Sequence, residues 1–138
     1  MKRILLVSAL SFCLCGCGFT QDSRQIPYLR ASVTTVADSI CVMVKPEDDE
    51  KFDTLRISEI GSENNKLEKY DLADVPVSPD KCVPNLDYRF EVGKSYNVAV
   101  ILVSPDKYKK GLQPSARIFR TSFTIIEKNG KWAVSSAN

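Results

Sequence analysis

The chain has 138 residues, of which 43% are hydrophobic and 26% are charged. This is enough material for one globular domain, and such a balance of apolar and charged residues is not typical of a disordered chain. The sequence contains no histidine, which excludes a Ser-His-Asp triad, a Cys-His pair and a metal site built on histidine. We therefore expect a single domain with no catalytic residues, no bound metal and no cofactor.

The first 17 residues have the features of a bacterial lipoprotein signal. Lys2 and Arg3 give a positive start, and residues 4–14 form an apolar run. A helix of that length spans about 16 Å, roughly half of a bilayer core, which is too short for a transmembrane anchor. The run ends in Leu-Cys-Gly-Cys, which matches a lipobox because small residues precede a cysteine, Cys17, whose thiol can carry diacylglycerol. An ordinary secretory signal with incidental cysteines is the alternative.

Cleavage before Cys17 divides the chain into a signal peptide (1–16), a lipidated tether (17–25) and a folded domain (26–138). The signal contains two basic residues, so the mature chain has 17 positive and 17 negative side chains. This neutral balance does not favour nucleic-acid binding. Acyl chains on Cys17 anchor the protein permanently. An aspartate directly after the lipidated cysteine favours retention in the inner membrane, but this chain has Gly18 there. We therefore expect the protein to be located at the periplasmic face of the outer membrane.

Two cysteines, Cys41 and Cys82, remain in the body of the chain. On the predicted cleavage, Cys13 and Cys15 leave with the signal, and we expect Cys17 to be lipidated. An even pair in an oxidising compartment predicts a disulfide, which for a loop of about 40 residues contributes roughly 4 kcal/mol. The alternative is a reactive thiol, but the pair lacks both a CxxC spacing and a histidine.

From residue 26 onwards, short alternating or apolar segments are separated by turn residues. The segments that we expect to be strands are residues 31–36, 40–44, 54–60, 67–72, 88–92, 96–103, 117–126 and 132–134. Asn129-Gly130 is a hairpin signal before the last of these segments. Because no helical period is evident, the sequence predicts an all-β fold, an immunoglobulin-like or fibronectin type III-like antiparallel β-sandwich of about seven strands.

The stretch FEVGKSYNVAV, which begins at Phe90, resembles the corner between strands E and F of fibronectin type III and other immunoglobulin-like modules. In those folds the glycine, here Gly93, permits a tight turn, and the tyrosine hydroxyl, here that of Tyr96, bonds back across the corner. On this register Phe90, Tyr96, Val98 and Val100 face the core. A plain hairpin with a strand tyrosine is the alternative.

The sequence Val-Ser-Pro-Asp-Lys occurs twice, at residues 77–81 and 103–107. Both copies contain the S-x-x-K spacing of the serine nucleophile in penicillin-binding enzymes, which requires the serine and lysine one helical turn apart. We expect the proline to hold both copies as turns instead. The chain is also too short for such an enzyme, so we expect no enzymatic activity.

Two charged loops carry the residues that we expect to bind a protein partner. The loop at residues 46–52 and the loop at 104–115 join strands B to C and F to G in a fibronectin-like order, which places both at one end of the sandwich. The acidic cluster of the first loop lacks the spacing of a calcium loop. An exposed tyrosine and leucine framed by charge are typical of an interface anchor with a polar rim, although solvated loops are the alternative. The candidate binding residues are Asp48, Asp49, Glu50, Lys107, Tyr108, Lys109, Lys110 and Leu112.

The lipobox, IPYLRASV at 26–33, ICVMV at 40–44 and EVGKSYNV at 91–98 together resemble a family of small enterobacterial lipoproteins, the type VI secretion immunity periplasmic lipoproteins. The resemblance implies a non-catalytic protein that binds and neutralises a toxin delivered into the periplasm, with neither a small-molecule substrate nor a nucleic acid as partner. Such a protein would use its loops or lend an edge strand such as residues 67–72. The alternatives are an accessory lipoprotein that docks to an envelope assembly, and an enzyme or small-ligand carrier.

Overall fold

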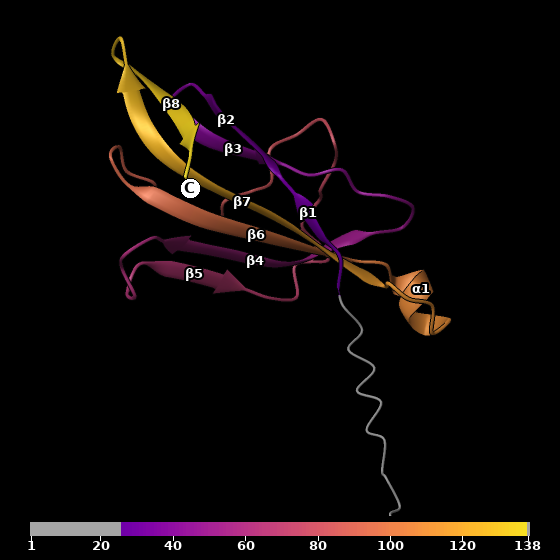
Figure 1. Ribbon diagram of the computed structural model, residues 1–138. Coiled ribbons are helices and arrows are strands. Elements are labelled where there is room, and N and C mark those ends of the chain that lie inside the picture. Colours follow the sequence, from indigo (N-terminus) through magenta and orange to yellow (C-terminus); the bar gives the residue numbers. More distant parts are fainter. Residues whose placement is uncertain (1–25, 138) are drawn as a thin grey trace, which may run out of the picture.

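Figure 1 shows the computed structural model of the chain. It describes residues 26–137, so the predicted signal peptide, the tether, Cys17 and Gly18 lie outside the described residues. The described elements are β1 (Tyr28–Arg30), β2 (Ser32–Val36), β3 (Ser39–Met43), β4 (Lys51–Glu59), β5 (Lys66–Lys69), β6 (Ser95–Val103), α1 (Pro105–Lys109), β7 (Ala116–Lys128) and β8 (Lys131–Ser136). The fold is all-β, as the alternating segments predicted. In the described part, no helix has the length and apolar character that crossing a membrane requires.

The strands form two sheets that pack as a sandwich. The larger sheet has the order β1-β7-β6-β4-β5. The strand β8 also pairs with β7, at residues 123–128, further along the strand than β1. The smaller sheet is the antiparallel pair of β2 and β3. Figure 1 shows β4, β6 and β7 running side by side, with β2 and β3 over one side of them. Apolar side chains from both sheets meet in a single core.

Alternation in the long strands, strict in β6, contributes most of this core, because successive side chains of a strand point to opposite faces of its sheet. In β6, every second side chain is buried and the intervening ones are exposed or half-buried. In β4 and β7 the alternation is interrupted, because Thr54 and Leu55 are both buried beside a register shift between Phe52 and Thr54, and Ile118 and Phe119 are both buried. The largest fully buried side chains of the larger sheet are Tyr96, Phe52, Phe123, Leu55, Ile57, Leu102, Ile125 and Val100.

The N-terminal strand differs from the prediction. Residues 28–30 form β1, which pairs with β7 in parallel, whereas we expected no strand here and only antiparallel pairs. The chain then changes sheet at the buried Ala31 and continues as β2. A strand of three residues is too short to show alternation in the sequence.

The segment from residue 71 to 94 crosses the core without the strand predicted at residues 88–92. Leu86 and Asp87 have positive φ values of 53° and 65°, which turn the chain and interrupt any ladder. The segment still meets the smaller sheet at one point, where the N–H of Val83 donates to the carbonyl of Val42 at 2.7 Å. Its apolar side chains cover the core in place of a strand.

The corner before β6 has the predicted geometry. The backbone N–H of Glu91 donates a 2.9 Å hydrogen bond to the hydroxyl of the fully buried Tyr96, and Gly93 has a φ of 84°. Phe90 and Tyr88 pack edge-on against the Tyr96 ring, with ring centroids 4.9 and 5.9 Å away. The tyrosine corner is therefore confirmed, and a plain hairpin does not describe this stretch.

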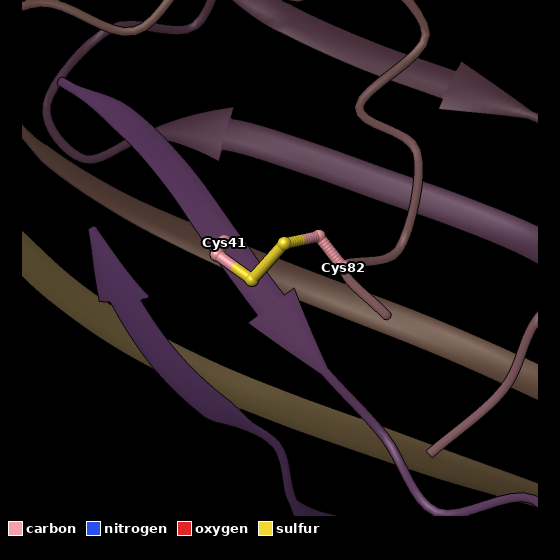
Figure 2. The surroundings of a disulfide bond; sticks show 2 residues. All are labelled: Cys41 and Cys82. Atoms are coloured by element: carbon pink, nitrogen blue, oxygen red, sulfur yellow. A yellow bond between two sulfur atoms is a disulfide. The ribbon is translucent and has the colours of Figure 1, made fainter. Parts of the chain in front are cut away.

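Cys41 and Cys82 form the predicted disulfide, shown in Figure 2. Their Cα atoms are 5.0 Å apart, although 41 positions separate them in sequence. The bond joins β3 to the segment that crosses the core without regular strands. Because both sulfurs are paired, neither cysteine is a free thiol.

Candidate partner-binding surface

The two charged loops lie at the same end of the sandwich, as the fibronectin-like order predicted. The antiparallel register of β4 and β6 places Lys51 opposite Val103, so the preceding loop and the following one are neighbours. Asp49 joins them. Its Oδ1 accepts a 2.5 Å hydrogen bond from the Ser104 hydroxyl, and its Oδ2 accepts a 2.9 Å bond from the backbone N–H of Asp106.

The second loop contains the helix α1, which projects from the end of the sandwich in Figure 1. Here the expectation of a turn was wrong. Ser104 is the N-cap and accepts a 3.2 Å bond from the N–H of Lys107, and Pro105 occupies the first turn, where a missing N–H costs nothing. The first Ser-Pro-Asp-Lys copy, at residues 78–81, does form a turn.

The helical second copy does not create the chemistry of an S-x-x-K nucleophile. Ser104 is only 1% exposed, and its hydroxyl is already engaged with Asp49 and with the backbone of α1. The Lys107 ammonium instead lies 3.8 Å from a carboxylate oxygen of Asp48. The serine therefore caps a helix and supports the loop.

Asp49 is held in its charged form by the same contacts. The hydrogen bond from the Ser104 hydroxyl, followed by that from the Asp106 N–H, holds the pKa of the Asp49 carboxyl below its ordinary value. A carboxylate that accepts two hydrogen bonds at the start of a helix also complements the helix dipole. Asp49 thus fixes α1 against the first loop, and we assign it a supporting role.

Glu50 is also committed to partners within the chain. Arg117 donates two hydrogen bonds to the Glu50 carboxylate, from Nε at 2.7 Å and from a terminal nitrogen at 2.5 Å. It also donates to the carbonyl of Lys45 at 2.9 Å. The Glu50 side chain is only 4% exposed. Burial raises its pKa, but the hydrogen bonds from Arg117 and from the Glu47 N–H outweigh this effect and hold the pKa below its ordinary value. Glu50 therefore braces the first loop and is not presented to solvent.

The other candidate residues form an exposed surface, which we call the loop tip. Tyr108 is 73% exposed and Leu112 is 52% exposed. The chain folds back after α1, since the N–H of Leu112 donates to the carbonyl of Lys107 at 2.9 Å, which brings the leucine to the helix. Charged side chains surround these two apolar groups. The loop tip consists of Asp48, Lys107, Tyr108, Lys109, Lys110 and Leu112.

The loop tip carries no arrangement suited to holding a metal. Within residues 26–137, no group of three or more histidine, cysteine, aspartate or glutamate side chains comes together. The three acidic candidate residues of the first loop have different partners: Asp48 lies near Lys107, Asp49 near Ser104 and Glu50 near Arg117.

A family model matches residues 28–128 of the chain and is described as a domain of unknown function (DUF7480). The chain belongs to this family. The matched region runs from the first residue of β1 to the last residue of β7, and so includes the disulfide, the tyrosine corner and the loop tip. The strand β8, which pairs with β7, lies outside the matched residues. No curated protein and no solved structure matches the chain.

Sequence reasoning missed the two residues that support the loop tip. Ser104 was detectable, because Ser-Pro-Asp is a helix-start signature with a capping residue, a proline in the first turn and an acidic residue after it. Arg117 carries no local signal, since its partner Glu50 is 67 positions away in sequence.

Proposed function

We propose that this protein is a lipid-anchored periplasmic binding protein, and more specifically an immunity protein that neutralises a type VI secretion effector by stoichiometric binding. Three features support the proposal. The N-terminal sequence ends in a lipobox at Cys17, the disulfide suits an oxidising compartment, and several segments resemble the immunity lipoproteins. On this proposal the protein is attached to the periplasmic face of the outer membrane.

The observation that carries the proposal is the exposure of Tyr108 and Leu112 on a loop that is already ordered. Asp49 and Ser104 hold α1 in place, so a partner does not have to order this segment when it binds. Preorganisation of this kind lowers the entropic cost of association. A tyrosine with a neighbouring leucine, framed by lysines, has the composition of an interface hot spot with a polar rim.

The edge strand β5 is a weaker candidate for binding. It ends the larger sheet, and adding a partner strand there is a known mode of recognition. However, three of its four residues are the charged and exposed Lys66, Glu68 and Lys69. Charges on an edge strand discourage strand addition. We therefore assign recognition of the effector to the loop tip.

Capture of the partner tests this function. The full chain with a C-terminal tag is extracted in detergent from cells that also produce a type VI secretion system and its effectors. The proteins that bind to it are identified by mass spectrometry. We expect a secreted effector to be enriched with the wild type and lost with Tyr108→Ala. Tyr70→Ala is the matched control, because Tyr70 is an exposed tyrosine outside the loop tip.

Two results contradict the proposal. One is unchanged effector capture by the Tyr108→Ala variant. The other is enrichment of envelope-assembly components in place of an effector, which supports the accessory lipoprotein instead.

A further inference from the structure

A row of arginines crosses the solvent face of the larger sheet. The strand registers place Arg56 of β4, Ala99 of β6, Arg120 of β7 and Arg30 of β1 next to one another. All three arginines are exposed, whereas their neighbours along β4 and β7 are buried or half-buried on the core side. Neighbouring strands are about 4.8 Å apart, so the row is roughly 15 Å long.

The small side chain at the centre of the row leaves a hollow. This hollow lies over Ala99 between Arg56 and Arg120 and has a volume of about 330 Å³. A second cleft of about 720 Å³ opens where β1 leaves β7 and β8 ends. Arg120 and Ser122 line both spaces, so the two adjoin along the arginine row, and we call them together the groove.

Neighbouring groups prepare this groove for an anionic ligand. The Arg120 guanidinium lies 4.4 Å from the centre of the Tyr28 ring, which holds it over the sheet. Ser122 donates a 2.5 Å hydrogen bond to the side-chain oxygen of Asn97 in the next row. The Asn97 amide nitrogen is thereby oriented as a donor beside the arginines.

Within the described part of the chain, none of the three guanidinium groups of the row has a carboxylate within 4.0 Å. Among residues 26–137, the basic side chains with a carboxylate within 4.0 Å are Lys94, Lys107, Lys110 and Arg117. Glu68 faces Arg56 in the register and keeps its negative charge while it accepts a 2.8 Å bond from the neutral Tyr70 hydroxyl, so one carboxylate lies at the β5 end of the row. Three guanidinium groups therefore converge on the groove, each of which can hold a carboxylate with two parallel hydrogen bonds.

We infer that this face of the sheet binds an acidic segment of a protein partner through Arg56, Arg120 and Arg30. The length of the row matches four to five extended residues at about 3.3 Å each, so several carboxylates of one segment reach the arginines together. The two adjoining spaces follow a row of three arginines, which suits a peptide segment better than a single ion. This inference goes beyond the proposed function, because it concerns other elements than the loop tip and holds whether or not the partner is a toxin.

Fluorescence anisotropy with the purified full chain in detergent tests the inference. The probe is a labelled peptide of eight glutamates, and a peptide of eight glutamines is the uncharged counterpart. We expect saturable binding of octaglutamate alone, weakened about fivefold by Arg56→Gln or Arg120→Gln and at least about tenfold by the double variant. Arg89→Gln is the matched control, since it removes the same charge from an exposed position in the segment at residues 71–94. It should leave the affinity unchanged.

Three results overturn the inference. The first is absence of saturable octaglutamate binding, and the second is an equal loss of affinity in the Arg89→Gln variant. The third is binding of the wild type to phosphatidylglycerol vesicles without binding to octaglutamate, which assigns the row to a lipid surface. The Tyr108→Ala variant separates this inference from the proposed function, because it should bind octaglutamate normally while losing the effector.

Discussion

Reduction of the Cys41–Cys82 disulfide should lower the free energy of unfolding by about 4 kcal/mol, the value that the chain-entropy model gives for a loop of this length. The bond closes a loop over 41 sequence positions and joins β3 to a segment that has no regular strand of its own. That segment covers part of the core, with Val83 buried and Tyr88 and Phe90 packed against the buried cluster. Without the bond, the conformational entropy of the unfolded chain rises. In the folded state, the segment at residues 71–94 is then no longer covalently attached to β3.

Urea denaturation measures this loss, followed by the fluorescence of Trp132, the single tryptophan of the chain. The oxidised and reduced wild type are compared with a Cys41→Ala/Cys82→Ala double variant. The double variant should unfold at a similarly reduced free energy and should not respond to reductant. A loss below about 1 kcal/mol in both the reduced protein and the double variant would refute the role that we give to the disulfide.

Three further predictions concern the corner, the braced loop and the anchor. Tyr96→Phe removes the acceptor of the part-buried hydrogen bond from the Glu91 N–H, so the free energy of unfolding should fall by about 0.5–1.5 kcal/mol in urea denaturation. Glu50 has a pKa below its ordinary value of 4.5, so the stability that it contributes is present above that pH and is lost as the pH falls through the lower value of the folded state. Thermal unfolding across acidic pH should show this loss in the wild type and less of it in Glu50→Gln. Cys17→Ser should abolish incorporation of labelled palmitate, whereas Cys13→Ser should not.

Each of these predictions has a result that would contradict it. For the corner, it is a Tyr96→Phe variant as stable as the wild type. For the braced loop, it is an acid dependence of unfolding that is identical with and without the Glu50 carboxylate. For the anchor, it is palmitate labelling that persists in the absence of Cys17.

The sequence predicted the parts of the fold that depend on local pattern. Alternation indicated strands such as β2, β4 and β7, because burial on one face of a sheet imposes a period of two, whereas a nearly continuous apolar run indicated β3 and the Asn-Gly turn indicated β8. The glycine and tyrosine around Gly93 and Tyr96 indicated the corner, because its geometry requires those residue types in a short span. The pair Cys41 and Cys82 was the only one left for a disulfide once the N-terminal cysteines were assigned to the signal and the anchor.

Features that depend on long-range contacts could not be predicted in this way. Residues 88–92 have the composition of a strand, but the positive φ values at Leu86 and Asp87 turn the chain away from a ladder. The acidic loop was expected to face a partner, yet Glu50 pairs with an arginine that is 67 positions away. The position of Arg117 beside this loop follows from the register of β6 and β7, which no local pattern reveals.

The central claim is that this protein acts by binding and not by catalysis, and the stoichiometry of neutralisation tests it most directly. The captured effector is titrated with the purified full chain while its toxic activity is measured. Neutralisation by the wild type should be complete at one chain per effector. The Tyr108→Ala variant should leave the effector toxic at that ratio. Complete neutralisation of a large molar excess of effector would show turnover and would contradict the claim.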